Sequence, residues 1–140
     1  MIRNGMIAAA VLSVASVASA AITLAPLATF GGGDGWSAPG ELAGVSLGTG
    51  SLERGLAYNP VTGNLILVSR NGALSNPIQI LNGTTGAFIA NLQQGSGVIT
   101  GGTFLTNMVG VANDGAIYVG NLSGSATAAF KVYRWGTEAD

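Results

Sequence analysis

The chain has 140 residues, with five basic and six acidic side chains and neither histidine nor cysteine. A formal net charge of −1 gives no basic face for a nucleic acid. Without His or Cys, the chain can form neither a Ser-His-Asp or Cys-His catalytic arrangement nor a zinc site with nitrogen or sulfur ligands.

The first twenty residues have the pattern of a secretory signal peptide. Arg3 supplies the positive charge, residues 6–18 are small or apolar, and Ala18-Ser19-Ala20 fits the cleavage site. The alternative is a membrane anchor, but the apolar run falls short of the roughly twenty residues that span a bilayer. We predict a signal peptide at 1–20, a secreted or cell-surface location, and no membrane span once the signal is cleaved.

Short apolar runs bounded by turn residues predict eight strands in residues 21–140. We expect them at residues 24–30, 55–58, 65–70, 78–81, 88–92, 108–112, 116–121 and 130–135. The segments 59–63 and 113–115 contain the Asn, Asp, Pro and Gly that tight hairpins favour. The continuous apolar run at 65–68 predicts a strand that is buried on both faces.

Two stretches of the chain resemble each other. Gly55-Leu56-Ala57 matches Gly110-Val111-Ala112, and further on 63–67 matches 115–119 and 78–81 matches 130–133. A period of about 40 to 50 residues with several short strands per copy is the spacing of β-propeller blades. The small residues that open each copy suit an innermost strand. We therefore predict an all-β fold of propeller type, with about two four-stranded antiparallel blades.

Two blades form an incomplete ring, because known propellers have about four to eight. Either the chain is part of a longer protein or several copies assemble one ring. We favour the first, since residues 136–140 follow a predicted strand at the point where an outer strand should come. The expected partners are accordingly the remaining blades of a longer chain, or other copies in a homo-oligomer.

Residues 53–65, 109–119 and 130–135 carry a family resemblance. They resemble exported bacterial propeller-like proteins of a family of unknown function, in which some members bear C-terminal cell-surface sorting signals. The resemblance covers most of residues 21–140. It implies propeller-type blades on an exported protein and no particular activity.

Four residues are candidates for ligand binding. Glu53 and Arg54 precede the first inner strand, where the loops of a propeller face its axial mouth, so they could hold a polar ligand; the alternative is an exposed pair of little energetic consequence. Trp36 and Trp135 could stack on sugar rings, although a tryptophan at a strand end also serves as packing. The glycine-rich run 31–35 lacks the following helix and lysine of a phosphate loop, so we predict a flexible loop there.

The sequence therefore predicts no catalytic residue, no metal ligand and no cofactor. We expect a non-enzymatic exported module that presents loops for surface interaction or adhesion to a protein or glycan ligand. One alternative is a lectin in which three copies form a six-bladed ring that binds glycans between blades. A second is a propeller hydrolase whose catalytic residues lie outside this chain.

Overall fold

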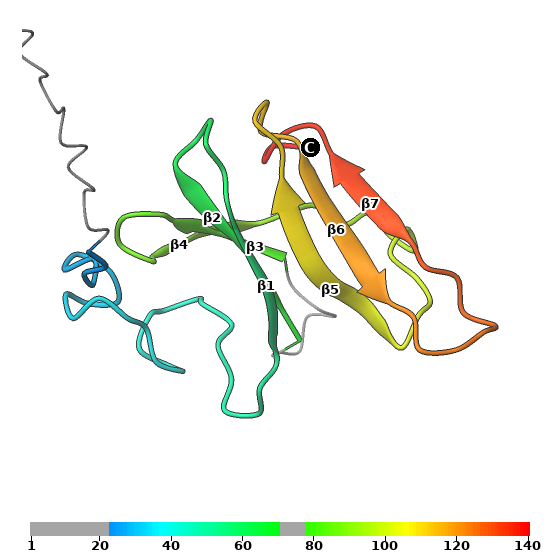
Figure 1. Ribbon diagram of the computed structural model, residues 1–140, viewed down its shortest axis with the longest axis horizontal. Helices are drawn as coiled ribbons and strands as arrows, with labels where there is room; N and C mark the ends of the chain where they lie inside the picture. Colours follow the sequence, from blue (N-terminus) through cyan, green and yellow to red (C-terminus); the bar gives the residue numbers. More distant parts are fainter. Residues whose placement is uncertain (1–22, 71–77) are drawn as a thin grey trace, which may run out of the picture.

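The computed structural model describes residues 23–70 and 78–140, and in this part of the chain it contains two antiparallel sheets and no helix (Figure 1). The first sheet has the order β1 (Glu53–Tyr58), β2 (Asn64–Ser69), β3 (Ile78–Asn82) and β4 (Phe88–Asn91). The second has the order β5 (Phe104–Val111), β6 (Ile117–Leu122) and β7 (Val132–Trp135). The all-β prediction is confirmed, while the predicted signal peptide at 1–20 lies outside the described residues.

Each sheet is a meander in which strands that follow one another in the chain are paired. The β1–β2 hairpin closes where the sequence predicts a turn: the Asn59 amide donates to the Asn64 carbonyl and the Gly63 amide to the Asn59 carbonyl, both at 2.8 Å. Gly63 adopts a φ of 76°, which a residue without a Cβ reaches at little cost. The register places Ala57, Ile66 and Ile80 in one row across the sheet.

The strand that we expected at residues 24–30 is not formed, so the described part of the chain has seven strands rather than eight. Instead the chain turns at Phe30: its amide donates to the Leu27 carbonyl at 2.8 Å, and its carbonyl accepts from the Gly33 and Gly35 amides. Four glycines between positions 31 and 35 take a positive φ, which a strand cannot accommodate. The turn carries the Phe30 ring onto Gly86 in the β3–β4 turn.

The loop segment before β1, residues 23–52, covers the face of the first sheet that points away from the second sheet, which we call the outer face. Gln79 of β3 fixes it there: the Gln79 side chain accepts from the Ser46 amide at 2.6 Å and donates to the Gly44 carbonyl at 2.8 Å. Val45 and Leu47 border a cavity of about 170 Å³, which is lined on the sheet side by Leu56, Leu65, Leu67 and Leu81. Residues 66–68 of β2 are buried, as predicted for a strand with both faces covered.

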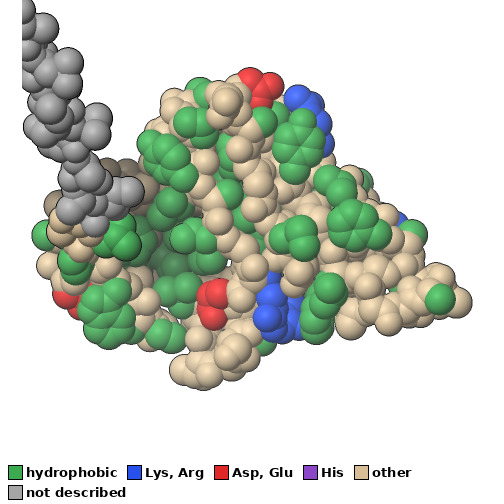
Figure 2. Space-filling model, viewed as in Figure 1, with side chains coloured by type: hydrophobic (Ala, Val, Ile, Leu, Met, Phe, Trp, Pro, Cys, Tyr) green, Lys and Arg blue, Asp and Glu red, His purple; other side chains and the backbone are tan. Residues whose placement is uncertain are grey.

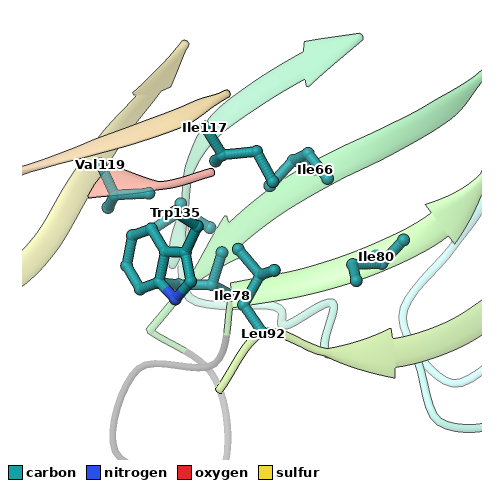
Figure 3. Packing of buried hydrophobic residues seen from close by; sticks show 8 residues of the cluster. Ile66, Ile78, Ile80, Leu92, Ile117, Val119 and Trp135 are labelled. Carbon is teal, nitrogen blue, oxygen red and sulfur yellow. The ribbon is translucent and has the colours of Figure 1, made fainter. Parts of the chain in front are cut away.

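The core lies between the two sheets (Figure 3). Ile66 from β2 points toward Ile117 from β6, and Trp135 from β7 packs beside Ile78 and Leu92. The side chains of Ile66, Ile78 and Ile117 are fully buried. Aliphatic burial of this kind contributes about 1.5–3 kcal/mol per side chain, so this layer is what holds the sheets together.

The first strands of the two sheets, β1 and β5, are in contact. A Cβ added at Gly55 would lie 2.9 Å from the Val109 backbone nitrogen, so the chains approach as closely as glycine permits. The sequence comparison pairs Gly55 with Gly110. Gly110 lies on the face of the second sheet that points away from the first sheet, and a Cβ added there would meet nothing within 4 Å. The segments that the sequence pairs occupy the same places in the two sheet orders: β1 and β5, β2 and β6, β3 and β7.

The face of the second sheet that carries Gly110 is uncovered, and we call it the open face. Figure 2 shows hydrophobic side chains exposed over β5, β6 and β7. Met108 is 53% exposed, Phe130 62% and Val132 56%, and these side chains border a hollow of about 280 Å³. Water therefore contacts this apolar face, whereas the equivalent face of the first sheet, which carries Gly55, is buried against the second sheet.

A polar latch joins the end of the chain to the β1–β2 hairpin. The Glu138 carboxylate accepts hydrogen bonds from the Asn59 amide group at 2.7 Å, the Thr62 hydroxyl at 2.6 Å and the Asn64 amide group at 2.8 Å. Asn59 is buried, so its side chain depends on this partner. The latch fixes the turn after β7 against the first sheet.

Candidate functional site

Two arginines and a phenylalanine meet at the end of the sheets where β1 begins, β2 ends and β5 begins. The guanidinium carbon of Arg70 lies 3.6 Å from the centre of the Phe104 ring, and that of Arg54 lies 5.8 Å from the same centre. Pairing of β1 with β2 creates this arrangement, because Glu53 lies opposite Ser69 and brings the two arginines to one end of the hairpin. We call Arg54, Arg70 and Phe104 the cationic cluster.

The hydrogen bonding of the basic side chains separates them into two kinds. The Lys131 ammonium group donates to the Thr100 carbonyl at 2.8 Å, and Arg134 donates from Nε to the Tyr118 hydroxyl at 3.2 Å. The bond to Tyr118 raises the pKa of Arg134. In residues 23–70 and 78–140, by contrast, Nε of Arg70 is buried without an acceptor, and the guanidinium group of Arg54 lies over the Phe104 ring without a side-chain hydrogen bond. The cationic cluster thus holds the two arginines of the described ranges whose side chains donate no hydrogen bond to the protein.

Glu53, predicted beside Arg54 as a ligand contact, has a structural partner. Its carboxylate accepts from the Gly48 amide at 2.6 Å and so fixes the loop that precedes β1. Arg54 lies at an irregularity in the β1–β2 register and contacts the Phe104 ring of β5, so the two adjacent side chains have different partners. Of the predicted pair, Arg54 alone joins the cationic cluster.

The two tryptophans lie elsewhere. Trp36 is 61% exposed in the loop segment before β1, where its amide donates to the Asp34 carboxylate at 3.2 Å. Trp135 belongs to the core and is 7% exposed, and its indole donates to the Gln93 carbonyl at 2.7 Å. Trp135 borders a hollow of about 390 Å³ but offers no open ring face for a sugar. Trp36 is the tryptophan with a ring available for stacking.

Within the described ranges, no three acidic side chains gather in a way that could hold a metal ion. No helix in these ranges is long and apolar enough to cross a membrane. Buried polar atoms without a partner are few here, namely Ser37 Oγ, Thr106 Oγ1 and Arg70 Nε. The last of these belongs to the cationic cluster, which makes that cluster the best candidate for a binding site.

The sequence pattern points to Arg54 but to neither Arg70 nor Phe104. Counting outward from the turn at 59–63 places Arg54 and Arg70 at the same end of one hairpin, so the pair could have been found. Phe104 comes from the second sheet and enters through the β1–β5 contact, which no local pattern reveals.

The fold is that of an all-β protein with two packed antiparallel sheets. No protein family matches the chain, and no curated protein does so either. A solved structure that is similar is that of a DUF4623 family protein from Bacteroides eggerthii, with 24% sequence identity and a TM-score of 0.48. The similarity covers 63% of this chain and 20% of that one, so the chain spans about a fifth of the neighbour's length.

Proposed function

We propose that this protein is a non-enzymatic exported module of β-propeller type, whose loops serve surface interaction or adhesion. The observation that carries the proposal is the placement of the two matched glycines. Gly55 lies at the contact between the sheets, while Gly110 lies on the open face with free space above it. A further sheet that packed on the open face as the second sheet packs on the first would continue the stack, which is how propeller blades are arranged.

The open face then has a partner, either the remaining blades of a longer chain or another copy of this one. Exposed apolar sheet faces of this kind mark interaction sites or aggregation liabilities. By contrast, the outer face of the first sheet is already covered by the loop segment that Gln79 holds. We therefore expect the next sheet on the open face.

The solution mass of residues 21–140, measured by light scattering after size exclusion, tests this. We expect association or aggregation of the wild type, and a monomer with an unchanged circular dichroism spectrum for Val132→Glu, which places a charge on the open face. Leu24→Glu is the control, because Leu24 is 92% exposed but lies outside both sheets. A soluble wild-type monomer that melts cooperatively would contradict the proposal.

A discrete trimer in the same experiment would favour the lectin alternative, in which copies complete a ring and bind glycans. The exposed ring of Trp36 is the observation that keeps this alternative open. A glycan array probed with wild type and Trp36→Ala then separates the two. If the protein is a lectin, the wild type binds glycans and the Trp36→Ala variant, which lacks the indole ring, does not. If it is an adhesion module for proteins, neither of them binds glycans.

Export is tested separately by mass spectrometry of the product secreted from a bacterial host. Cleavage after Ala20 is expected, so that Ala21 becomes the first residue. Retention of the uncleaved chain in the cytoplasm would refute this part of the proposal.

A further inference from the structure

The cationic cluster brings two positive charges together without an acid between them. The guanidinium carbons lie 3.6 Å and 5.8 Å from one ring centre, so they are separated by less than the roughly 10 Å over which charges interact at moderate salt. The adjacent carboxylate, Glu53, is engaged by the Gly48 amide. In the described residues, neither arginine therefore has a carboxylate as a hydrogen-bond partner.

The ring positions one of the two charges. Arg70 stacks on Phe104 at 3.6 Å, and such cation–π contact holds the plane of the guanidinium while its N–H groups stay free to donate around the edge. Arg54 is exposed on β1 beside it and can approach the same ligand from solvent. Figure 2 shows basic side chains exposed at the lower edge of the molecule, with a hydrophobic side chain on one side and an acidic one on the other.

Two planar guanidinium groups with free donors match the oxygens of a carboxylate or a phosphate, which arginine binds through paired hydrogen bonds. We propose that the cationic cluster binds such an oxyanion group on a ligand, with Arg54 and Arg70 as donors and Phe104 as the platform for Arg70. An oxyanion would accept hydrogen bonds from the terminal N–H groups of Arg70 and Arg54 and lower the repulsion between the two positive charges. The site deepens the proposed interaction function, because it defines the chemistry of the ligand. Its residues all come from the β1–β2 hairpin and β5.

Arginine side-chain NMR on the purified protein tests the site directly, with sodium glucuronate as the carboxylate probe and inorganic phosphate as the phosphate probe. Glucose and sodium chloride at matched ionic strength are the neutral and ionic controls. We expect saturable shifts of the Arg54 and Arg70 Nε signals with glucuronate, phosphate or both, and the stronger probe identifies the group that the site prefers. The controls should leave these signals unchanged.

Variants show whether the cluster itself binds. Arg54→Gln is expected to weaken binding by about tenfold or more, because it removes a charge-assisted donor, and Arg54→Lys to restore part of it. Arg134→Gln is the matched control, since it removes the same charge from a side chain that already has an acceptor in Tyr118. Phe104→Leu keeps an apolar residue but removes the stacking platform, and it should weaken binding while circular dichroism confirms the fold.

Three results would overturn the proposal: no saturable shift with either probe, equal shifts at Arg134, or equal shifts with sodium chloride. Each of them would leave the mass measurements on the open face unaffected. Failure of the oxyanion site is therefore distinguishable from failure of the proposed stacking function.

Discussion

Replacing Gly55 by alanine probes the contact between the sheets. The new Cβ would lie 2.9 Å from the Val109 nitrogen, 3.0 Å from Val109 Cγ1 and 3.2 Å from Met108 Cα, and two of these are backbone atoms that cannot rotate away. Overpacking of this kind costs about 1–3 kcal/mol. The loss of chain freedom in the unfolded state returns about 0.4–1 kcal/mol. We expect Gly55→Ala to lower the free energy of unfolding by about 1–2 kcal/mol.

Gly110→Ala is the matched control, because it makes the same change at the residue paired with Gly55 in sequence and meets nothing within 4 Å. It should leave stability unchanged or raise it by up to about 1 kcal/mol. Urea denaturation followed by tryptophan fluorescence measures both, since Trp135 is buried in the core and becomes exposed on unfolding. Both changes are best made in the Val132→Glu background, which we expect to be monomeric. Equal stability of the two variants would refute the close approach of β1 and β5.

The core, the latch and the C-terminal turn each give a further prediction. Ile117→Ala should cost about 2–5 kcal/mol of unfolding free energy, because Ile117 is fully buried between the sheets; Ile89→Ala, at a side chain 49% exposed on β4, should cost far less in the same denaturation assay. Glu138→Ala should cost about 1–3 kcal/mol by leaving the buried Asn59 side chain without its acceptor, and Glu138→Gln should cost less because it keeps one acceptor oxygen; equal losses in thermal melts would argue against the latch. The pKa of Asp140 is lowered by hydrogen bonds from the Thr137 hydroxyl and the Gly136 and Thr137 amides. Its carboxylate therefore stabilises the C-terminal turn at pH values above the ordinary pKa of aspartate, and this stabilisation is lost as the pH falls through the lowered pKa. The amide NMR shifts of Gly136 and Thr137 should change over that pH range. Shifts that do not depend on pH would contradict the prediction.

The strands after residue 52 could be predicted because their signals are local. Apolar runs bounded by Asn, Asp, Pro and Gly place β2, β3 and β6 closely, and the glycine at position 63 adopts the positive φ expected of its turn. The start of β5 is less well predicted: it begins at Phe104 rather than near residue 108, because an irregularity in the β5–β6 register lies between Phe104 and Met108. Irregular pairing has no clear sequence signal.

The absence of a strand at residues 24–30 has a definite physical cause. Leu24, Leu27 and Phe30 have the composition of a strand, but a strand also needs an edge to pair with. The chain instead forms a turn that the following glycines permit, and the outer face of the first sheet is covered by a loop segment. Which of these outcomes prevails depends on tertiary contacts, such as those of Gln79, that the local pattern does not contain.

The candidate site is predictable in part for the same reason. Arg54 stands out because it precedes the strand predicted at 55–58, and its neighbour Arg70 follows from the hairpin register. The burial of Trp135 and the contribution of Phe104 depend on how the two sheets pack. Sequence patterns define the sheets here, whereas the packing between them decides which side chains remain available for binding.

The packing of β1 against β5 is tested most directly by nuclear Overhauser effects in the Val132→Glu variant. We expect strong effects between the Gly55 α-protons and both the amide and methyl protons of Val109, and none between the Gly110 α-protons and any residue of the first sheet. Cross-strand effects within each sheet, accompanied by no effect between Gly55 and Val109, would contradict this packing.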